Sequence, residues 1–197
     1  MKVIIGLVGP SGVGKGFIKQ FLLEKYSDSF VEPVVVTTRP TRPTDGKDRL
    51  AGISQAKFRN MVDSKEVIMA HQPFGSQGDW YGFLAKSLAS ESTHVLTEVH
   101  IDNVINFRLL FAQSLYLIGL VGNSEYLGLN LDSRGTETAE DRRVRVESGI
   151  GESDEIKRLL DRGLVDEIVE VNSDNRDRLT NIVVDILTKR IPDLGSK

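Results

Sequence analysis

The residues that most clearly indicate a chemical role lie near the N-terminus. Positions 9–15 read Gly-Pro-Ser-Gly-Val-Gly-Lys and fit G-x-x-x-x-G-K. Glycines at these spacings let successive backbone N–H groups turn toward a polyphosphate, at the start of a helix whose partial positive charge attracts anions. Lys15 would place a point charge between the outer phosphates. A glycine-rich turn with a solvated lysine is the alternative. We favour a phosphate-binding loop for ATP, formed by Gly9, Ser11, Gly12, Val13, Gly14, Lys15 and Gly16.

The residue after the lysine, Gly16, departs from the usual form of this motif. Serine or threonine commonly stands there, and its hydroxyl binds Mg²⁺. Without that hydroxyl, we expect Mg²⁺ to be held by water and phosphate oxygens, together with a carboxylate elsewhere such as Glu98. A strand-end carboxylate that faces solvent is the alternative for Glu98, so no residue is assigned as a direct metal ligand.

Short apolar runs and an amphipathic segment must position this loop. Residues 3–8 are mostly β-branched and predict a buried parallel strand before it. Residues 14–25 carry apolar side chains at helical spacing and predict a helix after it. Residues 34–38 predict a second strand, which ends before Pro40 because proline lacks an amide donor and restricts the residue before it.

The rest of the chain alternates between strand and helix patterns after an irregular segment. Residues 41–81 are punctuated by Gly, Pro and Asp, with one short helix at 55–62, and predict a small inserted lobe. The charge-dense residues 132–162 predict a mobile helical lid. The other expected elements are strands at 94–99, 115–121 and 167–171 and helices at 101–112 and 177–189.

These patterns predict one α/β domain, a three-layer α/β/α fold of the P-loop type with a parallel central sheet, an inserted lobe and a helical lid. At 197 residues the chain is too short for two large domains. The expected segments are a core at 1–36, 84–131 and 164–197, a lobe at about 37–83 and a lid at about 132–163.

Composition limits the classes of function. The apolar share is 40% and the charged share 27%, which is ordinary for a soluble globular protein. A net charge of −3 argues against a nucleic-acid-binding surface. The absence of cysteine excludes disulfides, thiolate chemistry and cysteine-based zinc sites. The short apolar run at the start, broken by Gly6, lacks the length of a signal peptide or membrane span, so we expect a cytoplasmic protein.

The order of several further motifs resembles the guanylate kinase family across nearly the whole chain. Each segment alone could be a solvated loop or helix surface, but together with the phosphate-binding loop they follow the family's order and approximate spacing. The matching segments are Thr37–Pro43 (T-T-R-x-x-R-P), Asp45–Asp48 with Phe58 (D-G-x-D…F), Trp80-Tyr81-Gly82 (Y-Y-G), Arg134–Thr138 with Arg145 (the lid motif) and Val171-Asn172 (the loop beside the adenine).

The resemblance implies roles for residues of the loop, the lobe and the lid. Two arginines of the lobe would grip the acceptor phosphate, and two of the lid would close over the transferring group, where arginine binds phosphate oxygens in pairs and never loses its proton. The implied catalytic residues are Lys15, Arg39, Arg42, Arg134 and Arg145. Arg134 and Asn172 would also contact ATP, and the implied acceptor-binding residues are Arg39, Arg42, Arg49, Met69, Tyr81 and Glu98.

The positions that would read guanine match the family less well. Val35 and Phe83 replace hydroxyl residues, Arg49 replaces a tyrosine, and Met69 stands near the expected glutamate. Polar groups give large discrimination between substrates, whereas apolar replacements discriminate weakly. The sequence therefore retains the phosphate-handling residues and loses the base-reading ones.

The three histidines receive no catalytic role. Phosphoryl transfer needs no imidazole, so His94 and His100 are predicted to be structural or exposed. We assign no role to His71.

The leading interpretation is a cytoplasmic, ATP- and Mg²⁺-dependent kinase similar to the guanylate kinases, with GMP or dGMP as the acceptor. A divergent sugar-phosphate kinase, like the ribose 1,5-bisphosphate kinases, a phage-type deoxynucleotide kinase and a non-catalytic binding module remain alternatives. The complete P-loop and the lid arginines favour an enzyme over a binding module. We expect a monomer or homodimer without nucleic-acid or membrane partners.

Overall fold

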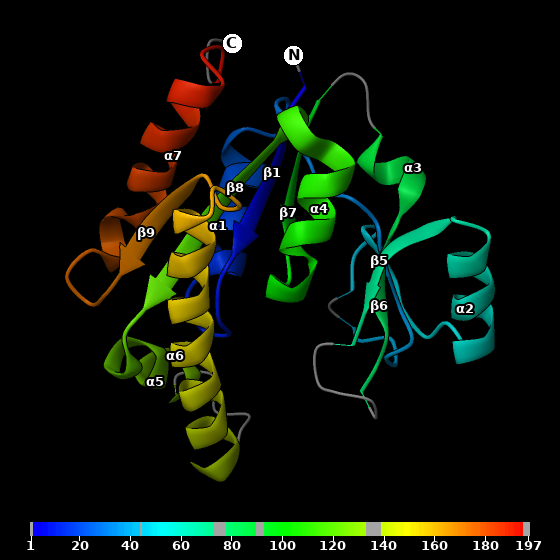
Figure 1. Ribbon diagram of the computed structural model, residues 1–197, viewed down its shortest axis with the longest axis horizontal. Helices are drawn as coiled ribbons and strands as arrows, with labels where there is room; N and C mark the ends of the chain where they lie inside the picture. Colours follow the sequence, from blue (N-terminus) through cyan, green and yellow to red (C-terminus); the bar gives the residue numbers. More distant parts are fainter. Residues whose placement is uncertain (1, 44, 73–77, 90–92, 133–138, 195–197) are drawn as a thin grey trace.

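The computed structural model describes residues 2–43, 45–72, 78–89, 93–132 and 139–194, which form two β-sheets and the helices around them (Figure 1). The larger sheet is parallel throughout, with the strand order β2-β7-β1-β8-β9. Its strands are β1 (Ile4–Val8), β2 (Phe30–Val31), β7 (His94–Glu98), β8 (Leu115–Gly122) and β9 (Glu167–Val171).

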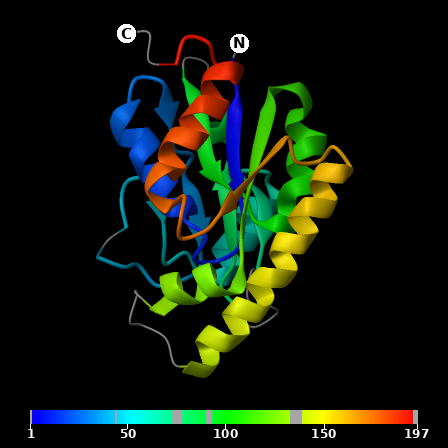
Figure 2. The same cartoon turned by 90° about the vertical axis from the view of Figure 1, so that its left-hand side faces the viewer.

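Helices cover both faces of this sheet, which confirms the predicted three-layer α/β/α fold. Helices α1 (Lys15–Lys25) and α7 (Leu179–Arg190) lie on one face, and α4 (Val104–Phe111) and α6 (Ala139–Asp161) lie on the other (Figure 2). Apolar residues of β1 alternate between two cores, with Ile5 packed toward α1 and α7. Ile4 and Val8 of β1 face the second core, to which α4 and α6 also contribute residues.

A second, four-stranded sheet forms the inserted lobe beside the core (Figure 1). Its order is β4-β3-β6-β5, with β3 parallel to β4 and antiparallel to β6. Helix α2 (Gln55–Asp63) packs on this sheet through Phe58, which is 1% exposed and centres a small separate core. The strands of the lobe are β3 (Val35–Thr37), β4 (Arg49–Leu50), β5 (Val67–His71) and β6 (Tyr81–Leu84).

Most elements of the core match the sequence prediction, whereas several of the lobe do not. The strand predicted at 34–38 forms as β3, but it pairs within the lobe, and one edge of the central sheet is the unpredicted β2. Strands β4 and β5 form within the segment predicted to be irregular, and β6 begins at its end. Elements without a prediction are α3 (Ala85–Leu88) and α5 (Ser124–Asp132). The 3₁₀ turns Ile101–Asn103, Ala112–Ser114 and Arg176–Arg178 lie at the ends of the helices predicted at 101–112 and 177–189.

The C-terminal half of helix α6 packs against the central sheet. Ile156 and Leu159 are buried in the core on the α4 side of the sheet. The N-terminal half extends beyond the sheet, where it borders the phosphate-binding loop (Figure 2). The segment expected as a lid therefore divides into a packed half and a projecting half. Among the described helices, none is long and apolar enough to cross a membrane.

Candidate active site

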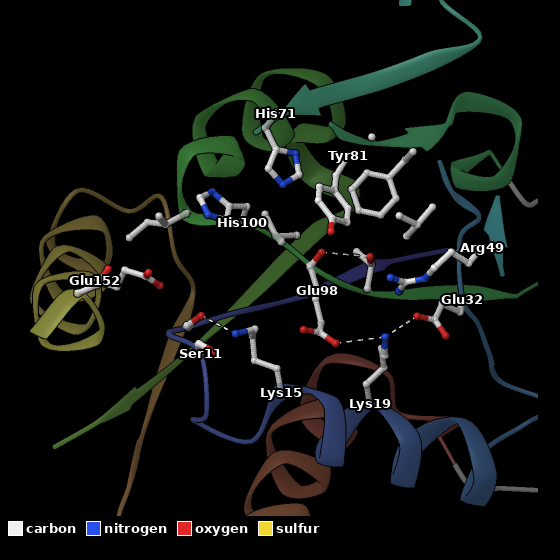
Figure 3. A pocket seen from close by; sticks show the side chains of 18 of the residues that line it. Ser11, Lys15, Lys19, Glu32, Arg49, His71, Tyr81, Glu98, His100 and Glu152 are labelled. Carbon is white, nitrogen blue, oxygen red and sulfur yellow. Dashed lines mark hydrogen bonds and ion pairs between the residues drawn. The ribbon is translucent and has the colours of Figure 1, made fainter. Parts of the chain in front are cut away.

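A cleft of about 830 Å³ opens at the carboxyl ends of β1 and β7, where the loop after β1 meets the lobe and α6 (Figure 3). Leu7 of β1 pairs in register with Glu98 of β7, so the two strand ends lie side by side. Strand β8 pairs with β1 on the side opposite to β7. This place, where neighbouring parallel strands connect to opposite sides of the sheet, is where ligands bind in open α/β folds.

The phosphate-binding loop has the backbone that its glycines predicted. Gly12 and Gly14 have φ values of 86° and 108°, in the left-handed region that favours glycine. A Cβ at Gly9 would lie 2.7 Å from the carbonyl oxygen of Leu120, so the loop packs closely on β8. The Lys15 ammonium donates to the carbonyl oxygens of Gly9 (2.6 Å) and Pro10 (2.9 Å), which holds it over its own loop.

Lys19, one turn after Lys15 on α1, forms an ionic cluster with Glu32, which follows β2, and Glu98 at the end of β7. The Lys19 ammonium contacts Glu32 Oε1 at 2.5 Å and Glu98 Oε1 at 3.2 Å. Burial acts to lower the pKa of Lys19, but the two carboxylates outweigh it and raise that pKa above its ordinary value. A Cβ at Gly16 would lie 3.9 Å from Glu98 Oε1, so the missing hydroxyl of the P-loop motif would have faced this carboxylate.

Helix α6 supplies one wall of the cleft. Arg145, Ser148 and Glu152 line it, and their spacing places them on one face of the helix. A Cβ at Gly149 would lie 3.2 Å from the Cβ of Pro10, so this glycine allows α6 to approach the phosphate-binding loop. Burial raises the pKa of the Glu152 carboxyl, although the charge of Lys15 partly opposes this.

The lobe forms the opposite wall, which is partly apolar and partly aromatic. Val35 and Phe83, the replacements noted in the sequence, both line it, as do Arg49 and Tyr81. Two histidines stand at its inner end, His71 from β5 and His100 after β7. Their ring centroids are 5.0 Å apart, and burial is the main cause that lowers the pKa of each imidazole.

The arginines expected at the acceptor phosphate lie outside the lining of this cleft. Arg39 is 4% exposed and pairs through both guanidinium Nη atoms with the Asp45 carboxylate. The Arg39 guanidinium, with the backbone N–H of Arg42, holds the pKa of Asp45 at about 2. The Arg42 side chain is exposed on the same loop. Met69 is buried in the core, apart from the cleft surface.

The structure therefore brings about half of the predicted site residues together. Arg134 lies outside the described residues. Val13 is fully buried under the loop, and Asn172 forms a turn with Asn175 beyond β9. The predicted residues that line the cleft are Gly9, Ser11, Lys15, Arg49, Tyr81, Glu98 and Arg145. Those that do not are Gly12, Val13, Gly14, Gly16, Arg39, Arg42, Met69 and Asn172.

A family model described as guanylate kinase matches residues 1–170, most of the chain. The chain belongs to the guanylate kinase family. It is 30% identical over 177 residues to a guanylate kinase from Prochlorococcus marinus subsp. pastoris, covering 86% of this chain and 94% of that one. A guanylate kinase from Lactobacillus acidophilus is 28% identical over 155 residues, which covers 76% of this chain and 74% of the relative.

The fold is that of a solved guanylate kinase as well. The crystal structure of the enzyme from Anaplasma phagocytophilum superposes with a TM-score of 0.69 at 20% identity, covering 96% of this chain and 86% of that one. Family membership and the named relatives support an enzyme with kinase activity and ATP as its phosphate donor.

Several residues that line the cleft of this chain were not predicted from its sequence. Lys19 follows Lys15 by one helical turn, so helical spacing alone could have placed it on the same face. Glu32, Ser148 and Glu152 belong to none of the motifs found in the sequence. The sequence analysis predicts His100 to be structural or exposed, because phosphoryl transfer needs no imidazole, and assigns no role to His71, yet both histidines line the cleft.

Proposed function

We propose that this protein is an ATP-dependent kinase that transfers the terminal phosphoryl group of ATP to a nucleoside monophosphate, with GMP or dGMP as the acceptor. The observation that carries this proposal is the cleft, where the phosphate-binding loop, the lobe wall and Arg145 of α6 face one common space. Family membership supports the same reaction. The comparisons do not favour the sugar-phosphate kinase, the deoxynucleotide kinase of phage type or the binding module.

The donor end of the cleft has the groups that a transferring phosphate needs. Backbone N–H groups of the loop and the Lys15 ammonium would hold the ATP phosphates, and Arg145 would add charge from α6. Asn172 would border the adenine beyond β9. Little covalent work is required of the protein in phosphoryl transfer, so positioning and positive charge are its main contributions.

The acceptor phosphate would be bound by Arg39 and Arg42, with Arg134 joining Arg145 over the transferring group. Arg39 now binds the Asp45 carboxylate with two parallel hydrogen bonds, the geometry that a phosphate offers. An acceptor phosphate would therefore have to exchange with Asp45. Arg49 and Tyr81 already line the cleft and would contact the acceptor from the lobe.

Magnesium would be held chiefly by phosphate oxygens and water. The described residues contain no group of three His, Asp or Glu side chains that could hold a metal ion, and Gly16 has no hydroxyl. Glu98, which faces the backbone of Gly16, fits a supporting role as a ligand or as an acceptor for metal-bound water. The ion would neutralise charge on the phosphates.

The cytoplasmic location, the monomeric or dimeric state and the absence of nucleic-acid and membrane partners stay predictions.

A coupled ADP-release assay tests the proposal. The acceptors are GMP, dGMP, dTMP, UMP and ribose 1,5-bisphosphate, each with ATP and Mg²⁺. We expect turnover with GMP and dGMP. Turnover with ribose 1,5-bisphosphate alone would assign the protein to the sugar-phosphate kinases. No turnover with any of the five would contradict the kinase proposal for this set.

A further inference from the structure

A strained bulge in the lobe separates two residues that a regular strand would place on one face. Strand β5 pairs with β6 at Ile68↔Phe83 and His71↔Tyr81, with a shift of register between them. Met69 has a φ of 57°, a left-handed conformation that a methionine rarely adopts. The Met69 side chain is buried, whereas His71 lines the cleft. Strain of this kind persists only where the surroundings impose it, and it concentrates at functional sites.

Asn103 is the residue that holds the bulge. Its side chain is 3% exposed, and its Nδ2 donates to the carbonyl oxygen of Met69 at 3.1 Å. The same Nδ2 lies 3.0 Å from His71 Nδ1. The Asn103 Oδ1 accepts from Asn106 Nδ2 at 3.4 Å, which is consistent with this orientation of the amide. One buried amide thus fixes both the strained peptide and the imidazole.

His71 Nδ1 lies between a hydrogen-bond donor and an acceptor. The Asn103 amide nitrogen, at 3.0 Å, only donates, whereas the Met69 carbonyl oxygen, at 3.1 Å, only accepts. Because the Met69 carbonyl already accepts from the Asn103 amide, we assign His71 Nδ1 as the second acceptor of that amide and place the proton of the neutral imidazole on Nε2. Among the described residues, both polar contacts of the ring fall on Nδ1. Burial lowers the pKa of His71, which favours this neutral form.

Two aromatic side chains flank His71 in the cleft. His100 and Tyr81 lie beside it, with ring centroids at 5.0 Å and 6.1 Å (Figure 3). The carboxylates among the described lining residues lie elsewhere in the cleft, and Asp102, which does not line it, lies 3.4 Å from His100 Nδ1. Glu32 and Glu98 bind Lys19, and Glu152 stands on α6. The inner end of the acceptor wall is therefore suited to a base edge that accepts hydrogen bonds.

We propose that His71 reads the base of the acceptor nucleotide, through an Nε2–H that donates to a carbonyl oxygen on the base edge. This inference rests on the proposed function and names the residue that sets base preference within it. On guanine the matching group is O6. The glutamate that the family pattern places near Met69 would accept hydrogen bonds, whereas His71 would donate one.

A hydrogen-bond donor in place of an acceptor predicts an unusual preference among purine nucleotides. A donor at this position reads O6, which hypoxanthine shares with guanine, and it does not read the 2-amino group. IMP should therefore be used within a few fold of GMP. Adenine presents an amino group where guanine has O6, so AMP should be used at least roughly tenfold less well, the effect of one hydrogen bond.

The test compares His71→Phe and His71→Gln with the wild type. Phenylalanine keeps a ring beside Tyr81 and His100 and removes the donor, whereas glutamine keeps an N–H. Turnover and calorimetric binding are measured with GMP, IMP and AMP, and ATP binding serves as the control. For H71F we expect about a tenfold rise in KM for GMP and IMP, unchanged AMP use and unchanged ATP binding. H71Q should keep most of the preference for GMP over AMP.

The outcomes separate the two proposals. If the wild type uses GMP but H71F keeps its preference over AMP, the role of His71 is wrong and the kinase proposal stands. If the wild type neither binds nor uses any nucleoside monophosphate, both fall. If circular dichroism shows that H71F does not fold, ¹⁵N spectra of the wild-type histidines decide. A His71 proton on Nδ1 overturns the inference, and an Nε2–H signal that shifts on GMP binding supports it.

Discussion

The two ends of the cleft are built in different ways. The donor end comes from one continuous stretch, in which a strand, a glycine-rich loop and a helix bring Ser11 and Lys15 into place. The acceptor end is assembled from β3, β5, β6 and the turn after β7, and it depends on a bulge held by a residue 34 positions away. The donor end is therefore fixed by local sequence, and the acceptor end by tertiary contacts.

The charges of the two ends differ in the same way. At the donor end the Lys15 ammonium lies against loop carbonyl groups, where a polyphosphate could replace those contacts. At the acceptor end Arg39, the arginine expected at the acceptor phosphate, is already paired with Asp45. Binding at the donor end thus uses a preformed cradle, whereas binding of an acceptor phosphate requires an exchange of partners.

The largest expected effect follows from removing the donor cation. Lys15→Ala should lower kcat/KM by roughly 10²–10³-fold, because the loop loses its point charge at the transferring phosphate. The ADP-release assay with GMP measures this, and circular dichroism checks the fold. Lys57→Ala, on the exposed face of α2, is the matched control and should leave activity unchanged. Near-normal activity of K15A would contradict the idea that the donor end is the phosphate cradle.

A second effect tests whether α6 joins the two ends. Arg145→Ala should lower kcat by about 10²-fold, with a smaller change in the KM for either substrate, because the charge would act mainly on the transferring group. Arg143→Ala is the control on the same helix, since Arg143 is exposed and binds only Glu140 and Glu147 among the described residues. Equal losses in the two variants would mean that the helix matters and the position of Arg145 does not.

The sequence predicted the donor end well because its determinants are contiguous. The strand, the left-handed glycines and the helix all follow from residue types within positions 3–25. The parallel core strands were equally visible, since buried parallel strands are continuous apolar runs. Strand β2 was missed because it has two residues, one of them exposed.

The acceptor end could not be predicted, because its determinants are not local. Strand β5 reads as a short apolar run in a segment rich in turn signals, and nothing in that run indicates a left-handed Met69. The bulge exists because Asn103, on a different element, binds the Met69 carbonyl. The ion pair of Arg39 with Asp45 could not be predicted either, because the sequence of a Pro-rich loop does not show which carboxylate an arginine will bind.

A third effect tests the exchange of partners at Arg39. Asp45→Asn should weaken the hold on this arginine, lower the KM for GMP and destabilise the lobe. The Asp45 pKa is about 2, below its ordinary value, so its stabilising charge is fully present above about pH 5 and is lost as pH falls through 2. Urea unfolding of wild type and variant should therefore differ at pH 7 and converge as pH falls below about 2. A difference that grows on acidification would contradict this account.

The smallest effect concerns Gly16, where the donor end departs from its own motif. Gly16→Ser would place a hydroxyl toward Glu98, and the space is open because the nearest atom to a Cβ there is Glu98 Oε1 at 3.9 Å. We expect a few-fold lower Mg²⁺ concentration for half-maximal activity, about the effect of one added ligand contact. Gly151→Ser, where a Cβ would meet nothing within 4 Å, is the control. An unchanged magnesium requirement in G16S would show that Glu98, phosphate and water already complete the metal's surroundings, so that the donor end works fully without the hydroxyl its motif usually carries.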